Sequence, residues 1–197
     1  MAERYTLLPS NKFFFKMRAY LISPLCLSMV FIFWKEWERE MFIWPLGLII
    51  IYLGAFLRVW AQRYCGKRIK SKEKGHNFLK TEGPYWFVRN PLYWGNMLVV
   101  CGMCVLSELI WFLPITILYS FFVYSKAIRY EEQVLRERFR EEYLDYCYRV
   151  PRWWPRWDKL KDSFYPWKDA IWVELGLFML PALFLVKELI DWVWRGI

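Results

Sequence analysis

Histidines and paired cysteines are scarce in this chain, and their scarcity argues against several kinds of site. The 197 residues include one histidine and five cysteines. The odd, scattered cysteines argue against a disulfide framework. Cys101 and Cys104 form a CxxC, but no second Cys or His pair accompanies it. We therefore interpret both as small packing residues of an apolar helix, and we expect no metal or redox site.

Other sequence signals are also missing. The chain has no internal repeat, no low-complexity tract and no known nucleic-acid-binding motif, so its net charge of +9 does not indicate nucleic acid as a partner. The N-terminal apolar run contains Lys12, Lys16 and Arg18 and has no clear cleavage site, unlike a cleavable signal peptide. Residues 1–197 are therefore expected to form one compact unit.

Apolar side chains are what the chain has in excess. Hydrophobic residues make up 57% of it, above the roughly 45–50% of soluble domains. A membrane-spanning helix needs about 20 mostly apolar residues, and five runs approach this length. These runs are Ala19–Trp34, Met41–Val59, Leu92–Leu106, Leu109–Ser125 and Ala170–Val186. The sequence predicts an all-α polytopic membrane protein with about five transmembrane helices.

The distribution of charge predicts the orientation in the bilayer. Bases precede the first run and fill the segment between the second and third, whereas Lys35–Glu40 carries three acids against two bases. The positive-inside rule then places the N-terminus on the cytosolic face. The same face receives the two long polar segments, Gln62–Asn90 and Lys126–Asp169.

The second polar segment contains a predicted amphipathic helix, Tyr130–Tyr148. Apolar and aromatic side chains recur in it at spacings of three and four, which indicates one stripe along a helix. The stripe consists of Leu135, Phe139, Tyr143 and Tyr146. Such a helix is expected to lie against the membrane or over a pocket on the cytosolic face, and to end near Pro151.

Polar residues should meet at the cytosolic end of the third and fourth runs. Only Ser107 and Glu108 separate these runs, which predicts a tight helical hairpin with both open ends together. Arg89 and Asn90 precede the hairpin, and the pair Glu131–Glu132 follows it. Ionisable groups at a membrane edge are often functional. The alternative is that they are interfacial residues in an ordinary ion pair.

Three segments resemble a known family, in the order in which that family has them. They are GAFLRVWAQRYCG (Gly54–Gly66), GPYWFVRNPLYWGN (Gly83–Asn96) and EEQVLRERFREEYLDYCYRVPRWWP (Glu131–Pro155). They resemble the isoprenylcysteine carboxyl methyltransferase and phospholipid methyltransferase superfamily. The resemblance implies a helical membrane enzyme that binds S-adenosylmethionine on the cytosolic side. It also implies a membrane lipid or a lipidated substrate, met at the lipid bilayer, as the acceptor.

The same resemblance implies roles for individual residues. Arg89 would lie closest to the methyl-accepting group. The chemistry of methyl transfer adds the hypothesis that Glu131 or Glu132 holds the cofactor's amino group or provides a favourable field for its sulfonium. Arg89 and Glu132 are thus the candidate catalytic residues. The candidate cofactor-binding residues are His76, Tyr85, Asn90, Pro91, Tyr93, Glu131, Tyr143, Tyr146, Arg149 and Pro151.

The chain departs from the family pattern at three positions. Asn90 stands where the family often has His, which removes a titratable group. Arg140 stands where Gly is common after Phe139, with little consequence expected on an exposed helix. His76 is shifted by about one residue from the family's position, and it is equally well interpreted as an ordinary loop residue.

The identity of the acceptor remains open at this stage. A carboxylate is already ionised at neutral pH and needs no base, and the chain has few candidate bases, so a carboxylate of the isoprenylcysteine type is favoured. Phospholipid amines and thiols are alternatives. So are a lipid reductase of related architecture that uses NADPH, and an adaptor without enzymatic activity. No glycine-rich fingerprint follows a strand, so the usual soluble methyltransferase fold is not supported.

Overall fold

The computed structural model describes residues 9–32, 40–64, 79–156 and 167–195, and within these ranges it is helical and contains no strand. The helices are α1 (Pro9–Phe31), α2 (Glu40–Tyr64), α3 (Pro84–Phe87), α4 (Pro91–Leu106), α5 (Leu113–Arg149), α6 (Lys168–Phe178) and α7 (Leu180–Arg195), with one 3₁₀ turn, η1 (Ile110–Phe112). The predicted all-α class is confirmed.

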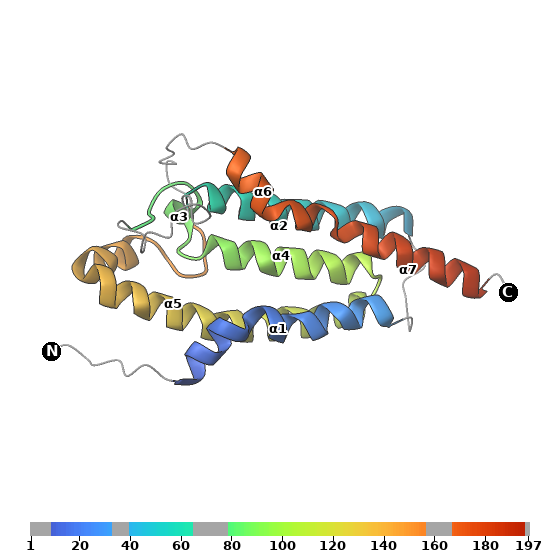
Figure 1. Cartoon of the computed structure of the whole chain (residues 1–197), viewed down its shortest axis with the longest axis horizontal. Helices are drawn as coiled ribbons and strands as arrows, with labels where there is room; N and C mark the ends of the chain where they lie inside the picture. Colours follow the sequence, from blue (N-terminus) through green and yellow to red (C-terminus); the bar gives the residue numbers. More distant parts are fainter. Residues whose placement is uncertain (1–8, 33–39, 65–78, 157–166, 196–197) are drawn as a thin grey trace.

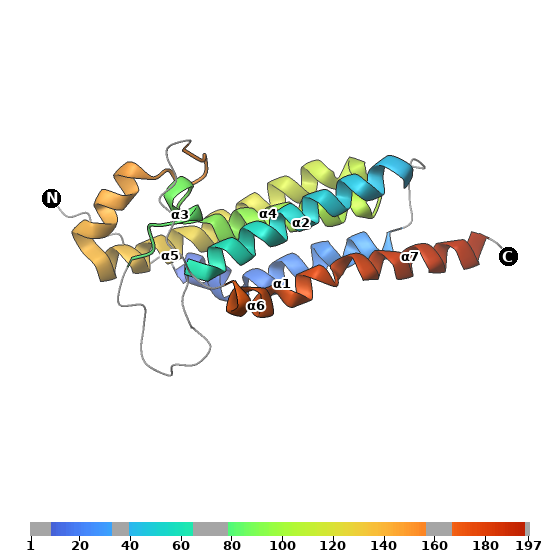
Figure 2. The ribbon, with the colours of Figure 1, turned by 90° about the horizontal axis from the view of Figure 1, so that it is seen from above.

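The long helices run side by side along the long axis of the molecule (Figures 1 and 2). Helix α4 lies in the middle of the bundle and contacts α1, α2, α5 and α7. Its side chains are accordingly the most uniformly buried, and eleven of its residues are shielded from solvent. The short helix α3 and the last turns of α5 gather at the end of the bundle where α4 begins (Figure 1).

Three helical stretches of the described chain are long and apolar enough to cross a membrane: Ser10–Phe31, Phe42–Tyr64 and Ile110–Arg149. Large apolar side chains such as Phe42, Phe56 and Leu118 are exposed on their outer faces, as expected where lipid is the solvent. The chain is thus an integral membrane protein. Helix α4 is a shorter apolar helix.

The fifth predicted span, Ala170–Val186, is not a single helix. The helix breaks at Met179, which separates α6 from α7. Pro181 stands in the first turn of α7 and cannot continue the backbone hydrogen bonds of α6. Neither piece is long enough by itself to cross a bilayer, so the prediction of five spans is not supported.

The start of the first predicted span also moves. The first helix begins at Pro9 rather than near Ala19, because lysines interrupt an apolar run without breaking a helix. Lys12 and Lys16 point to the exposed side of α1, where their long side chains can reach headgroups.

The amphipathic helix Tyr130–Tyr148 is not a separate element, which corrects the sequence-based prediction. It continues the fourth predicted span as one helix of 37 residues, α5, because nothing between Ser125 and Phe139 breaks a helix. The helix is bent at Arg140, whose φ is 44° and ψ is −115°. Beyond the bend its last turns fold towards α3 (Figure 2).

The bend also corrects the expectation that arginine at position 140 has little consequence. A positive φ with this ψ is a conformation that glycine adopts readily and that costs other residues roughly 1–3 kcal/mol. We expect Arg140→Gly to raise the free energy of unfolding by about 1 kcal/mol, because the side chain is exposed and only backbone strain is removed. Thermal unfolding in detergent measures this. Arg140→Ala is the control, and an equal gain from alanine would show that the backbone is not strained.

Helices α2 and α4 approach each other through glycines. A side chain at Gly54 would place its Cβ 2.8 Å from the carbonyl oxygen of Gly95, and one at Gly102 would place it 2.8 Å from the backbone nitrogen of Ile51. Small residues allow such approaches between membrane helices. This contact fixes the position of α4 and hence of the polar residues at its N-terminal end.

Candidate functional site

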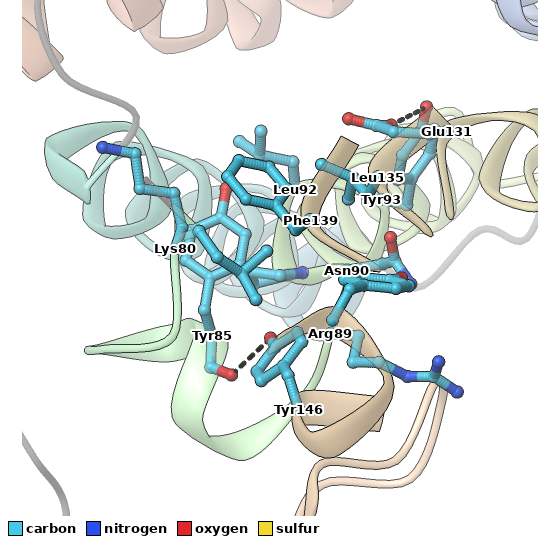
Figure 3. A pocket seen from close by; sticks show the side chains of 13 residues that line it. Lys80, Tyr85, Arg89, Asn90, Leu92, Tyr93, Glu131, Leu135, Phe139 and Tyr146 are labelled. Carbon is cyan, nitrogen blue, oxygen red and sulfur yellow. Dashed lines mark hydrogen bonds between the residues drawn. The ribbon is translucent and has the colours of Figure 1, made fainter. Parts of the chain in front are cut away.

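A cavity of about 120 Å³ lies at the end of the bundle, between α3, the start of α4 and the two sides of the bend in α5 (Figure 3). Its wall combines tyrosines and other apolar side chains with two cations and one carboxylate. The lining residues are Leu79, Lys80, Tyr85, Arg89, Asn90, Pro91, Leu92, Tyr93, Glu131, Leu135, Phe139, Tyr143 and Tyr146.

Two prolines and a glycine shape the first wall of the cavity. Pro84 begins α3 and Pro91 begins α4, and proline suits this position because the first turn needs no N–H donor. Gly83 has φ +60°, and a Cβ there would lie 2.3 Å from the ring of Tyr64, so only glycine fits. The break between α3 and α4 leaves Arg89 and Asn90 facing the second wall.

Hydrogen bonds hold the two walls together. The hydroxyl of Tyr146 donates to the carbonyl oxygen of Tyr85 at 2.7 Å. The backbone N–H of Arg89 donates to the carbonyl of Pro151 at 3.1 Å, and that of Arg156 donates to Phe87 at 3.0 Å. The segment after α5 therefore lies along α3, and the cavity is closed on that side by chain far away in sequence.

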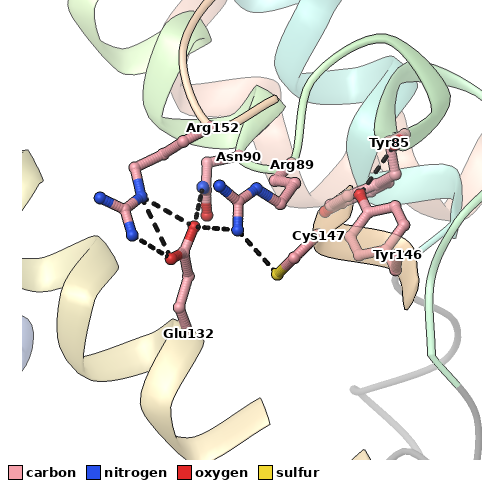
Figure 4. A network of polar contacts seen from close by, with 7 residues as sticks. All are labelled: Tyr85, Arg89, Asn90, Glu132, Tyr146, Cys147 and Arg152. Atoms are coloured by element: carbon pink, nitrogen blue, oxygen red, sulfur yellow. Dashed lines mark hydrogen bonds and ion pairs between the residues drawn. The ribbon is translucent and has the colours of Figure 1, made fainter. Parts of the chain in front are cut away.

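Glu132 is the centre of a buried polar network (Figure 4). Its side chain is 3% exposed. Arg152 Nη2 donates to Oε2 at 2.6 Å, and Arg152 Nε lies 3.1 Å from both carboxylate oxygens. Asn90 Nδ2 donates to Oε1 at 3.3 Å, and Arg89 Nη1 lies 3.4 Å from the same oxygen. The hydrogen bond to Glu132 raises the pKa of Arg152 above its ordinary value.

Glu131 faces a different direction from its neighbour, since adjacent helical residues point about 100° apart. Its Oε2 accepts a hydrogen bond from the hydroxyl of Tyr93 at 3.0 Å, and its side chain lines the cavity (Figure 3). Glu132 does not line the cavity. Of the two adjacent carboxylates, Glu131 is thus placed to touch a ligand, and Glu132 is placed to hold two arginines.

Most of the residues singled out from the sequence gather at this cavity. The expected proximity of Arg89, Asn90, Glu131 and Glu132 is confirmed. Tyr85, Asn90, Pro91, Tyr93, Glu131, Tyr143 and Tyr146 line the cavity together with Arg89.

The remaining candidates lie elsewhere. Arg149 is 48% exposed and pairs with Asp145 at 2.6 Å, away from the cavity. Pro151 contributes only its carbonyl oxygen, which accepts from the Arg89 backbone. His76 lies outside the described residues. The described ranges contain no group of three or more metal-ligating side chains.

Sequence reasoning missed Arg152 and Lys80. Arg152 lies just beyond the end of α5, after Pro151, and no role was predicted for it. A usable signal was available, because a carboxylate at an internal helix position needs a cation when it is buried. Lys80 belongs to a basic stretch in which nothing marks one lysine over the others.

Comparison with known proteins gives a consistent answer. The family model described as "Phospholipid methyltransferase" matches residues 42–142, just over half of the chain. "Protein-S-isoprenylcysteine O-methyltransferase B" from Arabidopsis thaliana is 32% identical over 141 residues, which cover 68% of this chain and 70% of that protein.

Two bacterial proteins named for metal resistance are similar to the same degree. "Nickel-cobalt-cadmium resistance protein NccN" from Alcaligenes xylosoxydans is 30% identical, covering 82% of this chain and 67% of the relative. "Cobalt-zinc-cadmium resistance protein CzcN" from Cupriavidus metallidurans is 30% identical, covering 62% of this chain and 55% of the relative. This chain therefore spans about half the length of CzcN. No solved structure matches the chain.

Proposed function

We propose, since this chain belongs to the phospholipid methyltransferase family and is a membrane methyltransferase, that it takes its methyl group from S-adenosylmethionine bound in the cavity of Figure 3. The observation that carries the proposal is the cavity's lining of a carboxylate and four tyrosines. A sulfonium cation is favoured beside a carboxylate, and tyrosine faces attract cations.

The fit concerns one end of the cofactor. The cavity volume of about 120 Å³ is below the roughly 300–1,000 Å³ of pockets that bury a whole drug-sized ligand. We place the methionine end inside, because the ionisable groups of the cavity suit its ammonium, carboxylate and sulfonium. Glu131 holds the cation, and Tyr85, Tyr143 and Tyr146 form the aromatic wall around it.

The reaction asks little acid–base chemistry of the protein. When bound, the cofactor supplies a methyl group on a positively charged sulfur, and an acceptor takes the methyl as the carbon–sulfur bond breaks. Arg89 orients the acceptor's anionic group through paired N–H donors. Glu131 and the tyrosines would hold the donor beside the acceptor, a gain in proximity. Glu132 acts through Arg89 and touches neither ligand.

We further propose a carboxylate of the isoprenylcysteine type as the acceptor. Arg89 and Lys80 give the cavity two cations for one carboxylate, which favours an anionic group. The described residues of the lining include no histidine, and a carboxylate needs no base. The name of the Arabidopsis relative agrees with this acceptor. Phospholipid amines and thiols are the alternatives within the same activity.

The cavity and the N-terminus are proposed to lie on the cytosolic face, with the acceptor's apolar part in the bilayer. Arginines cluster at the cavity end of the described bundle, including Arg63 in the last turn of α2 and Arg149, Arg152 and Arg156 after the bend. The opposite end carries Glu108 in the turn between α4 and η1 and one described base beside that turn, Lys187. This asymmetry follows the positive-inside rule.

Titration of S-adenosylhomocysteine into detergent-purified protein tests the donor. We expect binding to wild type and a roughly tenfold loss in Glu131→Gln, which corresponds to about 1.4 kcal/mol and is typical of losing one charge-assisted contact. Glu137→Gln is the matched control, because Glu137 lies on the same helix but is exposed. Folded wild-type protein that binds NADPH and not S-adenosylhomocysteine would instead establish the reductase alternative.

A further inference from the structure

The network around Glu132 has an imbalance of charge. Two guanidinium groups, those of Arg89 and Arg152, meet a single buried carboxylate (Figure 4). Arg152 takes the larger share, with contacts to both oxygens that are as short as 2.6 Å. Arg89 reaches only one oxygen, at 3.4 Å. The pair Arg152–Glu132 is thus nearly neutral, and the positive charge of Arg89 is left largely uncompensated.

Arg89 also has donors to spare. Its side chain is 11% exposed, and its Nε is buried without a hydrogen-bond partner among the described residues. Its Nη1 donates to the sulfur of Cys147, which is a weak acceptor. A buried guanidinium donor that lacks a partner is costly and calls for an explanation. Arg89 lines the cavity, so an anion bound there would satisfy both its charge and its donors.

We propose that Arg152 is a positioning residue that occupies Glu132 and thereby keeps Arg89 available to bind a carboxylate in the cavity. Without Arg152, the carboxylate of Glu132 would turn to Arg89, the next cation within reach, and would compete with the ligand. Because the chain's own carboxylate is always present, such competition would be permanent. This inference rests on the proposed function, since it concerns how the same cavity recognises its ligand.

Two ligands could supply the carboxylate, and the experiment separates them. The acceptor is represented by N-acetyl-S-farnesylcysteine in a methyl-transfer assay, which gives KM and kcat. The donor is represented by S-adenosylhomocysteine and its decarboxylated analogue, whose affinities are compared by titration. Both assays compare wild type with the Arg152→Ala variant. If only the KM of the acceptor changes, Arg89 binds the acceptor. If the ratio of the affinities for S-adenosylhomocysteine and its decarboxylated analogue changes, Arg89 binds the donor.

The decisive comparison is between Arg152→Ala and the double variant Glu132→Gln/Arg152→Ala. We expect Arg152→Ala to weaken carboxylate binding about tenfold, as loss of one charged contact does, and to leave kcat nearly unchanged. The double variant removes the competing charge and should recover to within roughly threefold of wild type. If Arg152 merely held the segment after α5 in place, changing Glu132 as well would not restore carboxylate binding.

Several results would overturn the inference while leaving the proposed function intact. One is a double variant as impaired as Arg152→Ala, in protein that still binds S-adenosylhomocysteine. Another is an Arg152→Ala variant with both carboxylate affinities unaltered. If Arg152→Ala does not fold, Glu132→Gln alone decides: the inference predicts tighter carboxylate binding, and a tenfold weakening would contradict it. A folded wild type that binds no S-adenosylhomocysteine would instead refute the proposed function.

Discussion

Glu174→Ala is expected to lower the free energy of unfolding by about 3–5 kcal/mol, the range for breaking a buried ion pair by removing one partner. Arg58 on α2 contacts Glu174 on α6 through two hydrogen bonds of 2.9 Å, from Nε and Nη2. The carboxylate is 2% exposed and the guanidinium 22%. Arg58 also donates to Asn96 Oδ1 on α4. Three helices therefore meet at one arginine.

The cost arises from the charge that stays behind. Arg58 lies against Gly95, where a Cβ would meet its Cγ at 2.5 Å, so its side chain cannot easily move away to water. Without Glu174 its charge would have only the neutral amide of Asn96 as a partner. The loss should act on α6 first, because this pair ties α6 to α2.

Thermal unfolding in detergent, followed by tryptophan fluorescence, measures the effect. The double variant Arg58→Met/Glu174→Leu should recover most of the stability, because apolar replacement of a whole buried pair is often neutral. The control is Asp145→Ala, which breaks the exposed pair with Arg149 and should cost no more than about 1 kcal/mol. Equal losses of stability from Asp145→Ala and Glu174→Ala would show that burial of the Arg58–Glu174 pair does not determine its contribution.

Local signals predicted the cavity better than they predicted the bundle. Arg89 and Asn90 precede a proline that begins α4, and Glu131 and Glu132 follow the return helix. A tight hairpin brings these positions together whatever else the chain does. Helical periodicity placed Tyr143 and Tyr146 on one face of α5, against the membrane or over a pocket, and the family resemblance assigned them to the pocket.

Features that depend on distant partners could not be predicted in the same way. Arg58 and Glu174 are 116 residues apart, and periodicity does not indicate which buried base meets which acid. The contact between Arg152 and Glu132 could not be predicted either, because it forms only after α5 bends. The bend itself stands at Arg140, a residue that usually favours helix, so tertiary contacts such as Tyr146 with Tyr85 override local preference there.

Contacts outside the family-matched segment complete the bundle. The match ends at residue 142, yet Glu174 on α6 binds Arg58, and Lys187 on α7 donates to the carbonyl of Ser107 at 3.0 Å. The first contact lies near the cavity end of α2 and the second at the opposite end of α4. Helices α6 and α7 are therefore each held to the bundle by a polar contact from their middle turns, although their apolar faces alone would give them no fixed register.

Gly54→Val is expected to destabilise the protein by at least the roughly 1–3 kcal/mol typical of overpacked cores. The added carbon would lie 2.8 Å from the carbonyl oxygen of Gly95 and 2.9 Å from the backbone nitrogen of Val99. Both obstacles are backbone atoms of α4, so no side-chain rotation relieves them. The two helices would have to separate. This contact lies one helical turn from Arg58 on α2 and near the start of α4, which lines the cavity.

Gly176 on α6 provides the matched control for Gly54, because a Cβ there meets nothing within 4 Å. The Gly54→Ala and Gly176→Ala variants should shift thermal unfolding in opposite directions. Alanine at position 176 gains helix propensity, worth up to about 1 kcal/mol, whereas at position 54 the same gain is outweighed by the clash. Equal stabilisation of both variants would show that α2 and α4 do not approach as closely as the glycines indicate. A loss at position 54 alone, with S-adenosylhomocysteine binding reduced in parallel, would show that this helix contact also determines the geometry of the cavity.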